Sequence, residues 1–295
     1  MITLSNGHSF EYMAASGALE FDGNGWPWEQ PLRWCGLLDP HLFTSVIKTL
    51  TRHPRRGNLK LYKPWTCVRL IKNGALNAVG LTNPGIEWWC KEIGPTIDSK
   101  KIPLIGSILS DDVSELGEMA EMLNPSDLVG LEINASCPNT KSDLLTHTQK
   151  VIDQVLRVKE KSRFPLILKL SVVHDVETIT KELEGCVEAF SINSVPWSTL
   201  YPNSKSPLAK LGGGGVSGKA AQPLTWKLVK KLHALSSTPI IAPSIWSFED
   251  IATARELGAN AISFGSLFIR YPWRPTLFIK KDSRLYDDTR NTSDA

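Results

Sequence analysis

Residues 128–139 have the sequence "LVGLEINASCPN", in which a predicted buried strand ends abruptly in polar residues. The run is strand-like through Leu131 and Ile133, and it continues with Asn134, Cys137 and Asn139. Short apolar runs of this kind are typical of strands that are buried on both faces of a parallel sheet. At the carboxyl end of this strand, the chain therefore presents a thiol between two carboxamides.

Seven other short runs are similarly rich in apolar and β-branched residues. The eight runs cover residues 11–16, 43–50, 102–109, 128–135, 164–172, 188–195, 238–244 and 260–267. Amphipathic helix patterns lie between several of them, at residues 114–123, 147–161, 177–185, 225–235 and 247–258. Strands that alternate with helices pair in parallel through crossover connections. Eight such strands in 295 residues predict an α/β fold, a (β/α)8 TIM barrel, with a doubly wound open sheet as the alternative.

Polar or small residues follow nearly every predicted strand. They are Ser16 and Gly17, Lys48 and Thr49, Ser107, Asn134 with Ser136 and Cys137, Lys169, Asn193 and Ser194, Ser244, and Gly265 with Ser266. In a parallel barrel these ends lie on one face, where barrel enzymes have their active sites. A buried lysine without a partner costs several kcal/mol, so Lys48 and Lys169 favour a shared site over coincidental polarity of the loops.

The remaining segments fit a single domain that covers residues 1–295. Residues 50–94 are too many for a simple connection between a strand and a helix, so they predict extra strands or a loop over the C-terminal mouth of the barrel. The sequence after Pro275 becomes polar, and we expect a tail that frays from about residue 281.

Composition excludes several classes of function. The net charge of +3 gives no reason to expect nucleic acid or an anionic membrane as a partner. No apolar run has the length of a signal peptide core or a membrane-spanning helix, so we expect a cytoplasmic protein. The five cysteines form no CxxC pair, which argues against a zinc site, a disulfide framework or any other metal centre.

The glycine-rich segment "LGGGGVSGKA", residues 211–220, invites a nucleotide interpretation. It fits GxxxxGK, but Ala220 stands where a P-loop needs a hydroxyl for magnesium. Consecutive glycines still allow close approach to a phosphate, with a flexible turn as the alternative. No GxGxxG opens a helix after a strand, and no HExxH or GxSxG occurs. A barrel with a glycine-rich loop and a lysine at mid-barrel suits FMN better than a nicotinamide cofactor.

The segment "NASCPN", residues 134–139, resembles the N-x-S-C-P-N signature of the class 1 dihydroorotate dehydrogenases, in which the cysteine is the catalytic base. The resemblance continues in register along nearly the whole chain. The other similar segments are "AASG" (14–17), "KTLTRHPRRGN" (48–58), "LNAVGLTNPG" (76–85), "ILKLS" (167–171), "SINSVPW" (191–197), "GGVSG" (214–218) and "FGSL" (264–267).

This resemblance implies an FMN-dependent oxidoreductase acting on CH–CH groups, which oxidises dihydroorotate to orotate in pyrimidine biosynthesis. Cys137 would remove a proton from the substrate and a hydride would pass to FMN, with Lys48 and Lys169 at the flavin. The implied substrate contacts are Asn77, Gly80, Leu81, Asn134, Asn139, Asn193 and Ser194. The implied FMN contacts are Ala15, Ser16, Gly17, Lys48, Thr49, Asn134, Lys169, Asn193, Ser217, Gly218, Ser244, Gly265 and Ser266. Relatives are homodimers, or pass electrons to a separate iron–sulfur and FAD subunit.

Three departures from the family pattern stand out. Pro243-Ser244 replaces the usual Gly-Gly, and since proline has no N–H, we expect a serine hydroxyl to replace the lost phosphate donor. The loop after Cys137 lacks the usual Pro-Gly elements, and Pro196-Trp197 predicts a reshaped pocket. The alternatives are a related flavin dihydropyrimidine oxidoreductase, a tRNA dihydrouridine synthase, which shares the N-x-x-C-P cysteine, or a non-catalytic barrel subunit. The near-neutral charge disfavours the RNA enzyme, and the retained polar residues disfavour the non-catalytic subunit.

Overall fold

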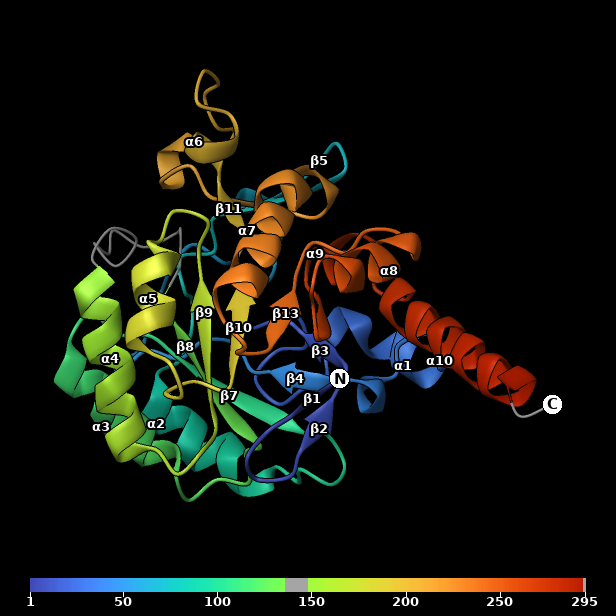
Figure 1. The fold of residues 1–295 in the computed structure, drawn as a ribbon. Helices are drawn as coiled ribbons and strands as arrows, with labels where there is room; N and C mark the ends of the chain where they lie inside the picture. Colours follow the sequence, from blue (N-terminus) through green and yellow to red (C-terminus); the bar gives the residue numbers. More distant parts are fainter. Residues whose placement is uncertain (136–147, 294–295) are drawn as a thin grey trace.

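The computed structural model describes residues 1–135 and 148–293, with side-chain surroundings given as far as residue 283. Eight parallel strands close into a barrel (Figure 1). In order around the barrel, they are β3 (Tyr12–Ala14), β4 (Thr44–Val46), β7 (Leu104–Ile108), β8 (Gly130–Asn134), β9 (Leu166–Leu170), β10 (Ala189–Ile192), β13 (Ile240–Ala242) and β14 (Ala261–Phe264). All eight lie within the runs predicted from the sequence. The barrel prediction is therefore confirmed, and the open sheet is wrong.

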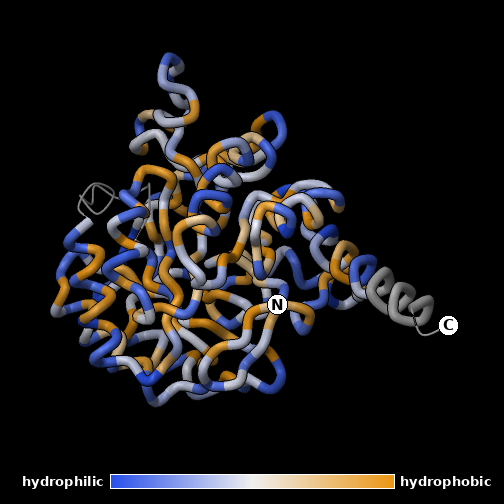
Figure 2. The backbone as a smooth tube through the Cα atoms, viewed as in Figure 1, coloured by the Kyte–Doolittle hydropathy of each residue, from blue (hydrophilic) through white to orange (hydrophobic). Residues whose placement is uncertain are grey.

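Helices cover the outside of the barrel. They include α3 (Val113–Leu123), α4 (Thr148–Lys161), α5 (Val176–Glu182), α7 (Gln222–Leu235), α8 (Glu249–Glu256) and α9 (Ser266–Arg270). Shorter helices are α1 (Gln30–Trp34), α2 (Ile86–Trp88) and α6 (Trp197–Leu200). Along α3 and α4 the hydropathy alternates, as amphipathic helices on a barrel require (Figure 2). None of the helices in the described part of the chain is long and apolar enough to cross a membrane.

Two layers of side chains with different chemistry fill the barrel. The N-terminal hairpin, β1 (Ile2–Thr3) and β2 (Ser9–Phe10), closes the lower end and packs on an apolar layer. That layer, called the floor here, contains Met13, Val46, Ile105, Ile167, Ala189, Ile241 and Ala261. Two residues further along the strands, the buried positions become polar: Ser107, Glu132, Lys169 and Ser191. Because side chains alternate along a strand, a step of two residues returns to the same interior face.

A second sheet, the lid sheet, consists of segments far apart in the chain. Its order is β11 (Val195–Pro196), β12 (Gly215–Ser217), β6 (Gly74–Asn77) and β5 (Val68–Ile71), all antiparallel. The predicted extra strands in residues 50–94 are therefore confirmed. The glycine-rich segment contributes a strand to this sheet as well as a loop. A Cβ on Gly214 would lie 2.5 Å from the backbone oxygen of Asn77, so this glycine permits the pairing.

The polar C-terminal segment forms a helix, α10 (Arg274–Ser293). Thr276, Ile279 and Asp282 are buried on its barrel side. The guanidinium of Arg255, on α8, donates to both carboxylate oxygens of Asp282, and Tyr12 donates to the same carboxylate. These contacts attach the first half of α10 to the barrel.

Candidate active site

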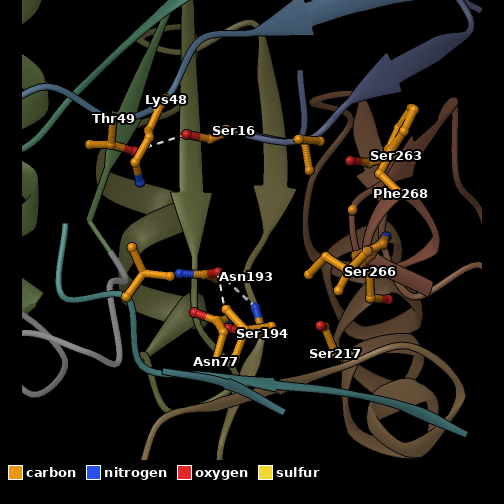
Figure 3. A pocket seen from close by; sticks show the side chains of 18 of the residues that line it. Ser16, Lys48, Thr49, Asn77, Asn193, Ser194, Ser217, Ser263, Ser266 and Phe268 are labelled. Carbon is orange, nitrogen blue, oxygen red and sulfur yellow. Dashed lines mark hydrogen bonds between the residues drawn. The ribbon is translucent and has the colours of Figure 1, made fainter. Parts of the chain in front are cut away.

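A cavity of about 540 Å³ opens at the C-terminal mouth of the barrel and extends beneath the lid sheet (Figure 3). Ligand sites in proteins commonly have volumes of roughly 300–1,000 Å³. The predicted site residues that line it are Ala15, Ser16, Gly17, Lys48, Thr49, Asn77, Leu81, Asn134, Lys169, Asn193, Ser194, Ser217, Ser244, Gly265 and Ser266. Residues separated by as many as 251 positions in the chain thus meet at one mouth.

Two of the predicted site residues that the structure describes are not part of the cavity lining. Gly80 and Gly218 are next to lining residues but are not among them. A Cβ on Gly218 would lie 2.8 Å from the ring of Trp246, so the space beside this glycine is occupied by protein. Cys137 and Asn139 lie outside the described residues.

A buried ion pair lies at the bottom of the cavity. The Glu132 side chain has no solvent exposure, and the Lys169 Nζ lies 3.2 Å from its Oε1. Glu132 also accepts hydrogen bonds from the hydroxyls of Ser107 (3.0 Å) and Ser191 (3.1 Å). Sequence reasoning missed Glu132, although it lies in the run that ends at Asn134. The sequence did indicate it, because Glu132 is a charged residue two positions before Asn134 and therefore lies on the same face of the strand.

A chain of hydroxyls connects this pair to the wall of the cavity. The Thr49 Oγ1 lies 2.9 Å from the hydroxyls of both Ser107 and Ser16, and it accepts a hydrogen bond from the Asn134 Nδ2. The Asn134 Oδ1 is buried and has no hydrogen-bond donor among the described residues. An unsatisfied buried acceptor costs about 1–3 kcal/mol, so this oxygen suits an N–H group of a ligand.

Carboxamides form a second wall. Asn193 follows β10, and its Oδ1 accepts hydrogen bonds from the backbone N–H of Ser194 at 2.8 Å and from its hydroxyl at 3.3 Å. Asn77, at the end of β6, lines the same cavity from the lid sheet (Figure 3). These groups offer both donors and acceptors to a flat polar ring.

Serines gather on the side of the cavity away from Lys48 (Figure 3). The lining there includes Ser217, Ser244, Ser263 and Ser266. Ser244 has φ +70°, a left-handed backbone conformation that favours glycine. Its hydroxyl accepts a hydrogen bond from Thr225 at 3.2 Å. The backbone after β13 therefore has a glycine-like conformation at a residue whose side chain carries a hydroxyl.

Aromatic and apolar side chains form the outer mouth. Trp26 and Trp28 stack with ring centroids 5.1 Å apart, and Trp65 and Leu70 also line the cavity. Burial raises the pKa of the nearby Glu29 carboxyl to about 7, while the backbone N–H of Trp26 donates to it at 2.8 Å.

Trp197 packs within the lid and does not form part of the cavity wall. Neither Pro196 nor Trp197 is among the lining residues. The Trp197 ring packs on Tyr201, with centroids 4.5 Å apart, and its Nε1 donates to the backbone oxygen of Ser204. The tryptophan thus supports the outer part of the lid instead of the pocket wall.

The chemistry of the lining suits a planar ligand with amide-like edges and an anionic group. The Lys169 ammonium pairs with the buried Glu132 carboxylate. Carboxamides line one wall of the cavity, and serine hydroxyls line the side away from Lys48. Within residues 1–135 and 148–293, no three His, Cys, Asp or Glu side chains converge where they could hold a metal ion.

Comparisons with known proteins place the chain among proteins of one family. A family model described as "Dihydroorotate dehydrogenase" matches residues 36–276. The dihydroorotate dehydrogenase A (fumarate) of Lactobacillus delbrueckii subsp. bulgaricus is 32% identical over 235 residues, covering 76% of this chain and 75% of that protein. The catalytic subunit of dihydroorotate dehydrogenase B (NAD(+)) of Geobacillus kaustophilus is 31% identical over 251 residues, covering 82% and 79%. The fold is similar to that of ligand-free DHODH from Eimeria tenella, with a TM-score of 0.67, 16% identity, and coverage of 91% and 81%.

Proposed function

Because the chain belongs to the dihydroorotate dehydrogenase family, we propose that it oxidises dihydroorotate to orotate with bound FMN and with Cys137 as the base. The observation that best supports the cofactor is the buried Oδ1 of Asn134, which has no hydrogen-bond donor among the described residues. Asn134 and Lys169 are directly paired residues of β8 and β9, and both line the cavity.

The lining residues fit FMN. Lys169 and Asn134 would hold the polar edge of its ring, and Ser217, Ser244 and Ser266 would donate to its phosphate in place of the glycine amides. When bound, FMN supplies the two-electron acceptor that amino-acid side chains lack. Among the charged residues, the Lys169 ammonium is suited to stabilise negative charge at the ring edge.

The substrate carries a carboxylate and an imide-like ring. Lys48 and the carboxamides of Asn77 and Asn193 would orient it through these groups, since they line one side of the cavity. Cys137 would then remove a proton from the ring carbon beside a carbonyl. A free thiol has a pKa of about 8.5, so a thiolate base favours turnover at slightly alkaline pH.

Flavin spectroscopy tests the proposal directly. The purified protein, reconstituted with FMN, should show flavin absorbance that bleaches when dihydroorotate is added without oxygen. A colourless protein that takes up no FMN would contradict the proposal and favour a non-catalytic barrel. Bleaching by another dihydropyrimidine but not by dihydroorotate would keep the cofactor and change the substrate.

Replacement of the cysteine tests its role. Cys137→Ser should bind FMN normally and turn over roughly 100-fold or more slowly, since a positioned base contributes about 10²–10⁴-fold. The exposed Cys35 offers a matched control, and Cys35→Ser should match the unmodified protein. Equal rates for both variants would remove Cys137 from the mechanism.

The electron acceptor and the assembly state are the remaining parts of the proposal. The names of the relatives include fumarate and NAD(+) with a catalytic subunit, and we propose a homodimer with one of these routes. Fumarate, NAD⁺, a quinone and oxygen should be compared as oxidants of the reduced protein. Light scattering gives the assembly size, and a requirement for a second protein in turnover would favour the subunit route.

A further inference from the structure

We propose that Glu132 is a positioning residue: it holds the Lys169 ammonium in place at the cavity, and through Lys169 it favours reduced over oxidised FMN. This inference rests on the function proposed above. Glu132 is buried and does not line the cavity, so its effect on the cofactor would pass through Lys169, which does line it.

The geometry around Glu132 leaves its carboxylate little freedom. Donors reach it from three strands: Ser107 on β7 and Lys169 on β9 donate to Oε1, and Ser191 on β10 donates to Oε2. With both oxygens engaged and no solvent exposure, the carboxylate is a fixed anion in the barrel interior.

Lys169 lies between this anion and the cavity. Glu132 is the hydrogen-bond partner of its ammonium among the described residues, and one of the three ammonium donors suffices for that bond. The Lys169 side chain is only 9% exposed, yet it lines the cavity. The remaining donors are therefore available to a ligand.

The charge pair is not needed to fill the barrel. Two residues before Lys169, β9 contributes Ile167 to the apolar floor, and the neighbouring strands β7 and β10 contribute Ile105 and Ala189. Apolar replacements of buried ion pairs are often neutral or stabilising, so packing does not explain why charges occupy the layer below a cavity.

A buried ammonium without a counter-charge tends to lose its proton or move toward water. Glu132 opposes both changes because it supplies a negative charge at a fixed position. The other charged side chains that line the cavity, among the described residues, are Lys48 and Glu29. Of Glu132, Lys48 and Glu29, it is Glu132 that forms an ion pair with Lys169.

The reduction potential of bound FMN tests the inference. Glu132→Gln should favour oxidised over reduced FMN by at least about tenfold, a shift of about 30 mV to more negative potential for a two-electron couple. Lys169→Met should shift the potential in the same direction. The double variant should match Lys169→Met to within about twofold in the ratio of reduced to oxidised FMN, since Glu132 acts through the lysine.

A second buried pair supplies the control. Asp282→Asn changes a buried carboxylate that pairs with Arg255 outside the cavity, so it should lower thermal stability without moving the potential. Should Glu132→Gln fail to fold, Glu132→Asp takes its place in the same comparison, because the shorter side chain withdraws the carboxylate from the Lys169 ammonium, and a shift to more negative potential is again expected.

Several results would overturn the inference. A Glu132→Gln protein with an unchanged or more positive potential would do so, as would separate shifts that add in the double variant. Failure of the proposed function has a different signature, because the unmodified protein would then take up no FMN or would not bleach with dihydroorotate. If Glu132→Gln bleached normally and had an unaltered potential, the role of Glu132 would be contradicted and the proposed function would stand.

Discussion

Two buried ion pairs in this molecule differ in their position: one lies at the cavity and the other lies outside it. Lys169 and Glu132 face each other from adjacent strands inside the barrel, and the lysine lines the cavity. Arg255 and Asp282 join α8 to α10 outside it. Both pairs place a cation and a carboxylate in a largely buried environment, where desolvation opposes the Coulomb attraction.

The difference lies in how many donors the protein itself uses. The Arg255 guanidinium donates to both oxygens of Asp282, to Glu11 at 2.6 Å and to the Tyr12 hydroxyl at 3.1 Å. The Lys169 ammonium donates to Glu132 at 3.2 Å, and its side chain lines an open cavity. A cation enclosed by protein acceptors acts as a structural connection, whereas a cation held on one side is available to a ligand.

The largest effect should come from breaking the barrel pair. Lys169→Met should slow flavin reduction by dihydroorotate by roughly 10²–10³-fold, the usual cost of removing one preorganised donor from a site of developing charge. Anaerobic stopped-flow absorbance measures this step. Arg255→Met should remain within about twofold of the unmodified rate. Similar slowing in both variants would show that barrel integrity, not the ammonium, limits the reaction.

Removal of the Arg255–Asp282 pair should lower stability while leaving the rate of flavin reduction almost unchanged. Arg255→Met leaves Asp282 and Glu11 near each other without a cation, and we expect it to lower the free energy of unfolding by about 3 kcal/mol. Denaturant unfolding followed by circular dichroism measures the loss. The exposed pair Lys101–Asp98 supplies the control, since Lys101→Met should change stability by less than about 1 kcal/mol. Equal effects would mean that burial does not distinguish the two pairs.

Glu29 is a buried carboxylate that, unlike Glu132 and Asp282, has no ion-pair partner among the described residues. Burial raises its pKa from 4.5 to about 7, so the folded state retains a proton between these values that the unfolded state has released. The stability contributed by this proton is present below pH 4.5 and is lost as the pH rises through 7, by up to about 3 kcal/mol.

Glu29→Gln should remove this dependence on pH. We expect the variant to be more stable than the unmodified protein by about 2 kcal/mol at pH 8 and similar to it at pH 4.5, because a buried amide retains some desolvation cost. Unfolding free energies across this range measure the difference. Parallel curves for the two proteins would contradict the raised pKa.

The sequence predicted the barrel well for a physical reason. Its strands are buried on both faces, so each appears as a compact apolar run, and their ends converge because parallel strands share one direction. The lid sheet is different. In β12 the residues Gly215, Val216 and Ser217 are too few to show alternation, and the partner strand β6 lies about 140 positions earlier.

The site was predictable in part for the same reason. Lys48, Asn134 and Lys169 follow apolar runs, so their position at the mouth could be inferred from sequence. Glu132 was not predicted to be at the site because it lies inside the apolar run 128–135, although side chains alternate between the two faces of a strand. The hydrogen bonds to Ser107 and Ser191 depend on the register between neighbouring strands, which no single run contains.

The smallest effect should come from the phosphate end of the cavity, where hydroxyls replace charges. Ser244 has φ +70°, so Ser244→Gly should relieve backbone strain and stabilise the protein by about 1 kcal/mol relative to Ser244→Ala. Both variants lose the hydroxyl. If that hydroxyl donates to the FMN phosphate, both should bind FMN several-fold more weakly, whatever their stability. Titration of apoprotein with FMN separates the two effects, since restored affinity in Ser244→Gly alone would assign the site to backbone conformation instead of the side chain.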